Sequence, residues 1–202
     1  MRPGFTMALT PATHREAPMQ ADFNVFLDAC VLANVSTCDL LLRLAERPRQ
    51  YRPLWSEEVL AETRRTQAKL GWPARLVTSF EAALRSTFPE ALVTGYEHLI
   101  PSVTNDPKDR HVLAAAAHAG AQVILTFNLK DFPAEALAPW GVKAKHPQDY
   151  LQTLYEMDAA QVVARIAEIA AKRGEDMEDV LVRFGVALPG FASRLLDDLN
   201  LS

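Results

Sequence analysis

Hydrophobic positions along the chain alternate between short apolar runs and longer stretches with helical spacing. Runs of three or four apolar residues are too short for helices and are typical of buried parallel strands. Such runs lie at residues 24–27, 52–55, 91–93, 122–125 and 142–144. Stretches with apolar residues every three or four positions predict helices at 39–46, 57–69, 74–87 and 147–155. This alternation predicts an α/β fold, a central parallel sheet flanked by helices.

One stretch, residues 105–132, combines all the elements of that pattern. Asp106 and Pro107 form a helix start, with Asp109 in the first turn of an alanine-rich helix. Gly120 ends that helix, and the apolar run at 122–125 follows. Residues 126–131 leave the carboxyl end of that strand, which is where open α/β sheets bind ligands.

The pattern changes after Met157. Three amphipathic helices are predicted at residues 159–172, 178–186 and 189–199, with Gly174 ending the first. We therefore expect an α/β domain at residues 23–150 and a small helical C-terminal extension at 151–202. Residues 1–22 contain four prolines or glycines and no proper apolar core for a signal peptide, so we expect a disordered tail.

Composition narrows the class of protein. The chain is 49% hydrophobic and 23% charged, and no apolar run approaches the roughly 20 residues of a membrane helix. Its net charge of −4 argues against nonspecific nucleic-acid binding by the whole chain, although residues 43–85 carry nine Lys or Arg against five Asp or Glu. Cys30 and Cys38 make no disulfide framework, which favours a reducing, cytoplasmic location.

Carboxylates lie at four predicted strand ends or helix starts. They are Asp28, the group Glu57, Glu58 and Glu62, the pair Asp106 and Asp109, and Asp131 beside Asn128. Carboxylates that are crowded together repel one another, and a hard cation such as Mg²⁺ relieves that repulsion. Each residue also has an ordinary structural explanation: helix capping, the helix dipole, a turn, or an ion pair such as Glu62 with Arg65. Their joint placement carries the prediction of a metal site.

Taken together, these stretches resemble the PIN-domain ribonucleases, and in particular the VapC-like toxins of type II toxin–antitoxin pairs. The matching segments are residues 26–32, 39–45, 54–62, 106–116 and 126–132. The helical tail is similar to a C-terminal extension found on some of these proteins. The resemblance implies an endonuclease that hydrolyses RNA with Mg²⁺ or Mn²⁺, a cognate antitoxin partner and no membrane association.

The resemblance also implies roles for individual residues. The first family Asp falls on Asp28, the family Glu on Glu62 and the next Asp on Asp109, with Asp106 as an extra acid. The fourth acidic position is open, because either Asn128 or Asp131 can take it, and the number of metals stays open with it. Basic or polar neighbours expected to meet phosphate groups are Ser56, Arg64, Arg65, Lys108, Arg110 and Lys130.

Other classes fit less well. A haloacid-dehalogenase phosphatase needs an Asp two residues after its first Asp, and here that residue is Cys30. A receiver domain needs an acidic pair near the first strand, and flap-type nucleases need a longer chain. The remaining alternative is a catalytically degenerate PIN-fold module that binds RNA or protein. The apolar face of residues 39–45 or the tail could bind the antitoxin or form a homodimer.

Overall fold

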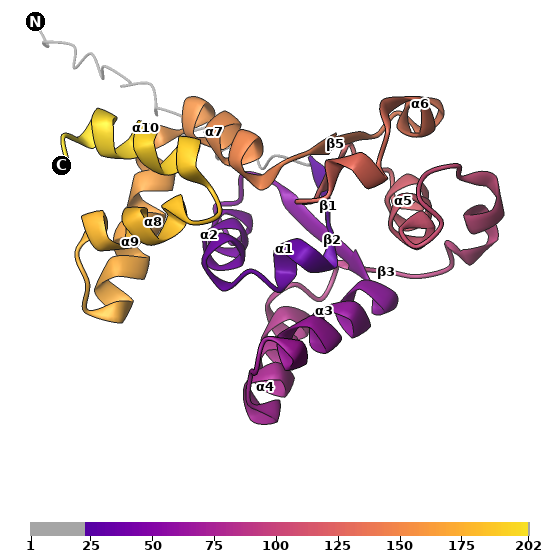
Figure 1. Cartoon of the computed structure of the whole chain (residues 1–202), viewed down its shortest axis with the longest axis horizontal. Helices are drawn as coiled ribbons and strands as arrows, with labels where there is room; N and C mark the ends of the chain where they lie inside the picture. Colours follow the sequence, from indigo (N-terminus) through magenta and orange to yellow (C-terminus); the bar gives the residue numbers. More distant parts are fainter. Residues whose placement is uncertain (1–22, 202) are drawn as a thin grey trace, which may run out of the picture.

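Five parallel strands form the centre of the molecule (Figure 1). The structure is a computed structural model that describes residues 23–201; the predicted tail at residues 1–22 lies outside the described residues. The strands are β1 (Asn24–Leu27), β2 (Arg52–Ser56), β3 (Leu92–Val93), β4 (Val123–Leu125) and β5 (Lys143–Lys145). Their order across the sheet is β3-β2-β1-β4-β5. The predicted parallel α/β sheet is thereby confirmed.

The strand order places a topological switch point between β1 and β4. The chain moves outward from β1 to β2 to β3 and then returns to add β4 on the other side of β1. Val25 pairs with Pro53 of β2 and with Val123 of β4, and the three residues of β4 are buried. Ligands bind open α/β sheets beyond the carboxyl ends of the strands at such a point.

Helices cover both sides of this sheet. Helices α2 and α5 lie on opposite sides of the strands, and α3 and α4 form a hairpin that projects from them (Figure 1). The helices up to β5 and the one after it are α1 (Ala29–Leu32), α2 (Val35–Ala45), α3 (Glu57–Lys69), α4 (Ala74–Thr87), α5 (Arg110–His118), α6 (Ala134–Leu137) and α7 (Pro147–Met157). Short 3-10 helices are η1 (Glu97–Ser102), η2 (Leu129–Asp131) and η3 (Ala138–Trp140).

Some predicted boundaries were wrong. Residues 29–32 form helix α1, which was not predicted, and α2 begins four residues before the predicted start because the Asn34 side chain accepts a hydrogen bond from the Thr37 amide at 3.1 Å. The α5 helix begins at Arg110, after the predicted start at Asp106. There the Asp106 carboxylate accepts from the Lys108 amide at 3.0 Å, forming a turn before the helix.

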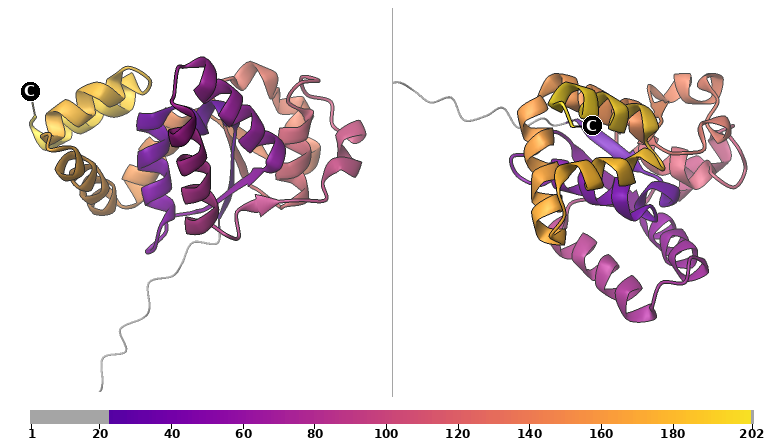
Figure 2. Two further views of the ribbon diagram at one scale, coloured as in Figure 1. Left: turned by 90° about the horizontal axis from the view of Figure 1, so that it is seen from below. Right: turned by 60° about the vertical axis from the view of Figure 1, so that its left-hand side comes forward.

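The C-terminal helices are α8 (Ala159–Arg173), α9 (Met177–Gly185) and α10 (Pro189–Leu199). Gly174 ends α8 with a φ of 67°, as its position predicted. These helices gather beside α2 and α7 (Figure 2), and their buried residues continue the core of the sheet without a break. The domain division at residue 150 stays a prediction. Within residues 23–201, no helix combines the length and the apolar character needed to cross a membrane.

Candidate active site

Asp28 lies at the switch point, directly after β1. Its side chain is only 4% exposed, and its backbone amide donates to the carbonyl of Leu125 at the end of β4. The Thr126 hydroxyl donates to Asp28 Oδ2 at 2.7 Å, and the Cys30 thiol donates to the same oxygen at 3.0 Å. A buried carboxylate requires such partners, and here they come from both of the strands that flank the switch point.

Thr126 and Cys30 also hold the loop that follows β4. Thr126 Oγ1 accepts from the Asn128 amide at 3.0 Å, and Cys30 Sγ accepts from the Phe127 amide at 3.3 Å. Burial, helped by the charge of Asp28, raises the pKa of the Cys30 thiol to about 12, so this thiol remains a donor at neutral pH. Neither residue was predicted to have this role. The position of Thr126 at a strand end was the available signal.

Three further aspartates surround Asp28. Asp109 stands at the start of α5, and the backbone amide of Asp106 donates to the carbonyl of Asp131 at 3.2 Å, which joins their two loops. Burial, followed by the charges of Asp28, Asp131 and Asp106, raises the pKa of the Asp109 carboxyl to about 6, against a smaller opposing effect of His111. The structure therefore brings Asp28, Asp106 and Asp131 within electrostatic reach of Asp109, and these four residues are here called the aspartate group.

Asn128 differs from the aspartates. It is exposed and precedes η2, where its backbone amide, rather than its side chain, makes the bond to Thr126. Asp131 lies at the end of the same short helix and is partly exposed. The choice between these two residues for the fourth position stays open.

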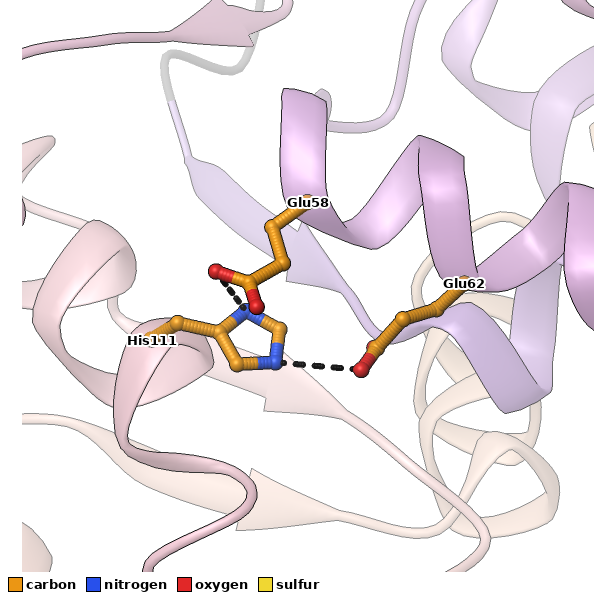
Figure 3. Close-up of side chains that lie close together, drawn as sticks. All are labelled: Glu58, Glu62 and His111. Carbon is orange, nitrogen blue, oxygen red and sulfur yellow. Dashed lines mark ion pairs between the residues drawn. The ribbon is translucent and has the colours of Figure 1, made fainter.

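Glu62 extends from α3 toward α5 and meets His111 there. Glu62 Oε1 lies 3.5 Å from His111 Nε2, and Glu58 Oε2 lies 3.8 Å from His111 Nδ1 (Figure 3). Arg65 is 3.7 Å from the same Glu62 oxygen, which gives the ion pair that the sequence suggested. We call Glu58, Glu62 and His111 the glutamate–histidine group. His111 was not among the predicted site residues.

The predicted phosphate contacts occupy varied positions. Ser56 is fully buried and caps α3 by accepting from the Val59 amide at 3.3 Å, while Arg64 pairs with Glu81 of α4 at 2.5 Å. Arg110 Nε donates to the carbonyl of Asn105 at 3.4 Å. The remaining three, all of which are exposed, are Arg65, Lys108 and Lys130. Contact of any of these residues with phosphate stays a prediction.

The aspartate group fits a hard divalent cation by its donor chemistry. All its side-chain donors are carboxylate oxygens, which Mg²⁺ and Mn²⁺ accept, and the pKa of Asp109 is raised by burial and by neighbouring negative charges, whose repulsion a cation would relieve. Among residues 23–201, the only three acidic, His or Cys side chains with ligand atoms all within 4.8 Å of one another are the glutamate–histidine group. The aspartates are thus more widely spaced, which suits an ion that retains several waters.

The fold and this group of acids define a family. A PIN-domain family model matches residues 21–130, more than half of the 202-residue chain. The chain therefore belongs to the PIN-domain family.

One relative makes the family assignment more specific. "Putative ribonuclease VapC50" of Mycobacterium tuberculosis (strain ATCC 25618 / H37Rv) is 38% identical over 133 residues, which cover 62% of this chain and 78% of that protein. The resemblance to VapC-like PIN proteins predicted from the motifs is confirmed. No solved structure gives a significant match to the chain.

Proposed function

We propose that this protein is a metal-dependent endoribonuclease and the toxin of a type II toxin–antitoxin pair. Family membership and the ribonuclease name of the mycobacterial relative support this proposal. One structural observation carries it: the buried Asp28 at the switch point and the raised pKa of the neighbouring Asp109. A buried acid that acts electrostatically on a second acid at a ligand-binding edge is typical of a catalytic metal site.

Asp28 and Asp109 would hold Mg²⁺ or Mn²⁺, with Asp106, Asp131 and Glu62 contributing directly or through water. When bound, the cation would activate water and offset negative charge on the phosphodiester. Thr126 and Cys30 fix the direction of the Asp28 carboxylate through their two hydrogen bonds. Asn128 is proposed to orient water at the edge of the group, since its amide offers both a donor and an acceptor.

RNA would approach across the edge of the sheet that bears these acids. The exposed Lys108 and Lys130 flank Asp106 and Asp131 in sequence, so they are the proposed phosphate contacts. An antitoxin that covers this edge, and a homodimer, are the proposed protein partners. Since RNA and reduced thiols occur together in the cytoplasm, we propose that the protein acts there.

The test compares purified wild-type protein with Asp28→Asn on total RNA, each with Mg²⁺, with Mn²⁺ and with a chelator. Asp179→Asn serves as the matched control, because Asp179 is an exposed carboxylate on α9. We expect metal-dependent cleavage by the wild type and the control, and at least a hundredfold loss in Asp28→Asn.

Equal cleavage by Asp28→Asn would refute the assignment. If the folded wild type, shown by mass spectrometry to carry no antitoxin, binds RNA but cleaves none of it, the chain is a degenerate binding module. The neutral Asn128 at the fourth position is the feature that favours this second candidate.

A further inference from the structure

The glutamate–histidine group has the composition of a transition-metal site. Glu58 and Glu62 are four residues apart on α3, so their side chains leave the same face of the helix. His111, the second residue of α5, points between them (Figure 3). One oxygen of each carboxylate and one ring nitrogen all lie within 4.8 Å of one another.

His111 is buried without a hydrogen bond. Its side chain is only 5% exposed, and within residues 23–201 neither of its ring nitrogens has a hydrogen-bond partner. The carboxylates of Glu62 and Glu58 face these nitrogens at 3.5 and 3.8 Å, which is too long for directed N–H···O bonds. Buried polar groups in proteins nearly always have a partner, so this imidazole requires an explanation.

The separations suit ligands that share a cation. Zn²⁺ binds nitrogen and carboxylate oxygen at about 2.0–2.2 Å, and tetrahedral geometry then places neighbouring ligand atoms about 3.4 Å apart. The observed 3.5 Å between His111 Nε2 and Glu62 Oε1 is close to that value. Glu58 faces the other ring nitrogen, Nδ1, at 3.8 Å, so its half-exposed side chain has to turn toward Nε2 to complete the set around one cation.

We propose that Glu58, Glu62 and His111 bind one transition-metal cation of the Zn²⁺ class, at a site beside the aspartate group that shares Glu62 with it. An imidazole nitrogen favours Zn²⁺ over Mg²⁺, which prefers oxygen ligands alone. Three protein ligands leave a fourth position open to water or substrate. Glu58 and Glu62 are 51% and 31% exposed, so an ion can reach the group from solvent.

The two sites meet at His111 and Glu62. Burial lowers the pKa of His111, but the carboxylates of Glu62, Glu58 and Asp109 outweigh it and the net pKa is raised. A proton therefore competes with a metal for the imidazole, and a protonated His111 would join α3 to α5 by ion pairs alone. Measuring metal binding without RNA distinguishes a metal-bound His111 from a protonated His111. The result does not depend on the ribonuclease proposal.

The experiment titrates Zn²⁺ into the full-length protein after chelator treatment and desalting, by calorimetry and by competition with a chromophoric chelator. We expect one Zn²⁺ per chain, bound in the presence of millimolar Mg²⁺. His111→Gln and Glu58→Gln should each weaken binding at least tenfold. Glu58 is exposed, so its variant keeps the fold even if His111→Gln does not, and circular dichroism checks both.

Two control variants test other places where Zn²⁺ could bind. The rings of His98 and His118 are 5.6 Å apart, and Cys30 lies beside Asp28. His98→Gln and Cys30→Ser should bind Zn²⁺ as the wild type does. The proposal is overturned if the wild type binds no stoichiometric Zn²⁺, if Glu58→Gln binds it unchanged, or if either control loses it.

Discussion

Replacing Asp109 with Asn should stabilise the metal-free protein at neutral pH. Asp109 has a folded-state pKa of about 6 against an ordinary 3.8, because burial and the charges of Asp28, Asp131 and Asp106 disfavour its ionised form. Between these two values the folded state binds more protons than the unfolded state, so stability falls as pH rises from about 4 to about 6. The loss of folding stability caused by the ionised Asp109 is complete above about pH 6 and absent below about pH 4.

The size of the effect follows from the shift. A difference of about two pKa units corresponds to about 3 kcal/mol, since one unit is about 1.4 kcal/mol. Asp109 is partly exposed, and solvent screening reduces this to about 1–1.5 kcal/mol. Asn is neutral and nearly the same size, so Asp109→Asn should gain that amount at pH 7.5 and nothing at pH 4.

Urea unfolding in the presence of a chelator, at pH 7.5 and at pH 4, measures this difference. Asp179→Asn, an exposed carboxylate on α9, should change stability by less than about 0.5 kcal/mol at either pH. Millimolar Mg²⁺ should then stabilise the wild type more than Asp109→Asn, because the cation binds the folded carboxylates. The reasoning fails if Asp109→Asn is no more stable at pH 7.5, or if its gain is the same at both pH values.

Substitutions at three further positions test the packing around the site and the core. Thr126→Val removes the hydroxyl that donates to Asp28 and should lower the free energy of unfolding in urea by about 1.5–3 kcal/mol. Thr126→Ser keeps the hydroxyl and should lower it by about 1 kcal/mol. Equal losses would contradict a role for the hydroxyl. Tyr51→Phe should cost about 1 kcal/mol by chemical unfolding, because the buried Tyr51 hydroxyl donates to the carbonyl of Leu41 at 2.7 Å; no loss would show that this bond is neutral. Phe191→Ala should lower the free energy of unfolding by about 3–5 kcal/mol, and in calorimetry it should lower the temperature of a single cooperative melting transition. A separate transition at lower temperature would show that α8–α10 unfold independently of the sheet.

Local signals in the sequence were sufficient for many elements of the fold. The predicted bounds of α3 and α4 agree with the structure because Ser56 caps the first helix and Pro73 precedes the second. The start of α5 was misplaced because Asp106 followed by Pro107 has the composition of a helix cap, and an aspartate turn has the same composition. Helix α6 was missed, since its four residues are too few to show a period.

The site was only partly predictable, because strand order is a long-range property. Apolar runs indicate parallel strands, and so they place Asp28, Asp131 and Glu62 at or near one edge of the sheet. They do not indicate that β4 returns to the side of β1, which brings Thr126 into contact with Asp28. The contact of His111 with Glu62 depends on how α5 packs against α3, for which the sequence has no local signal.

The same strand order explains why the acids divide into two groups. Asp28 follows β1 and Asp131 follows β4, which are adjacent strands, whereas Glu58 and Glu62 belong to the helix that follows β2 on the other side of β1. Neighbouring strands are about 4.8 Å apart, so the glutamates start at least one strand away from the aspartates of β4. The start of α5 spans this gap, with Asp109 on one side and His111 two residues later on the other. One group thus offers oxygen alone and the other adds a nitrogen, which is why we propose cations of different chemistry for the two groups.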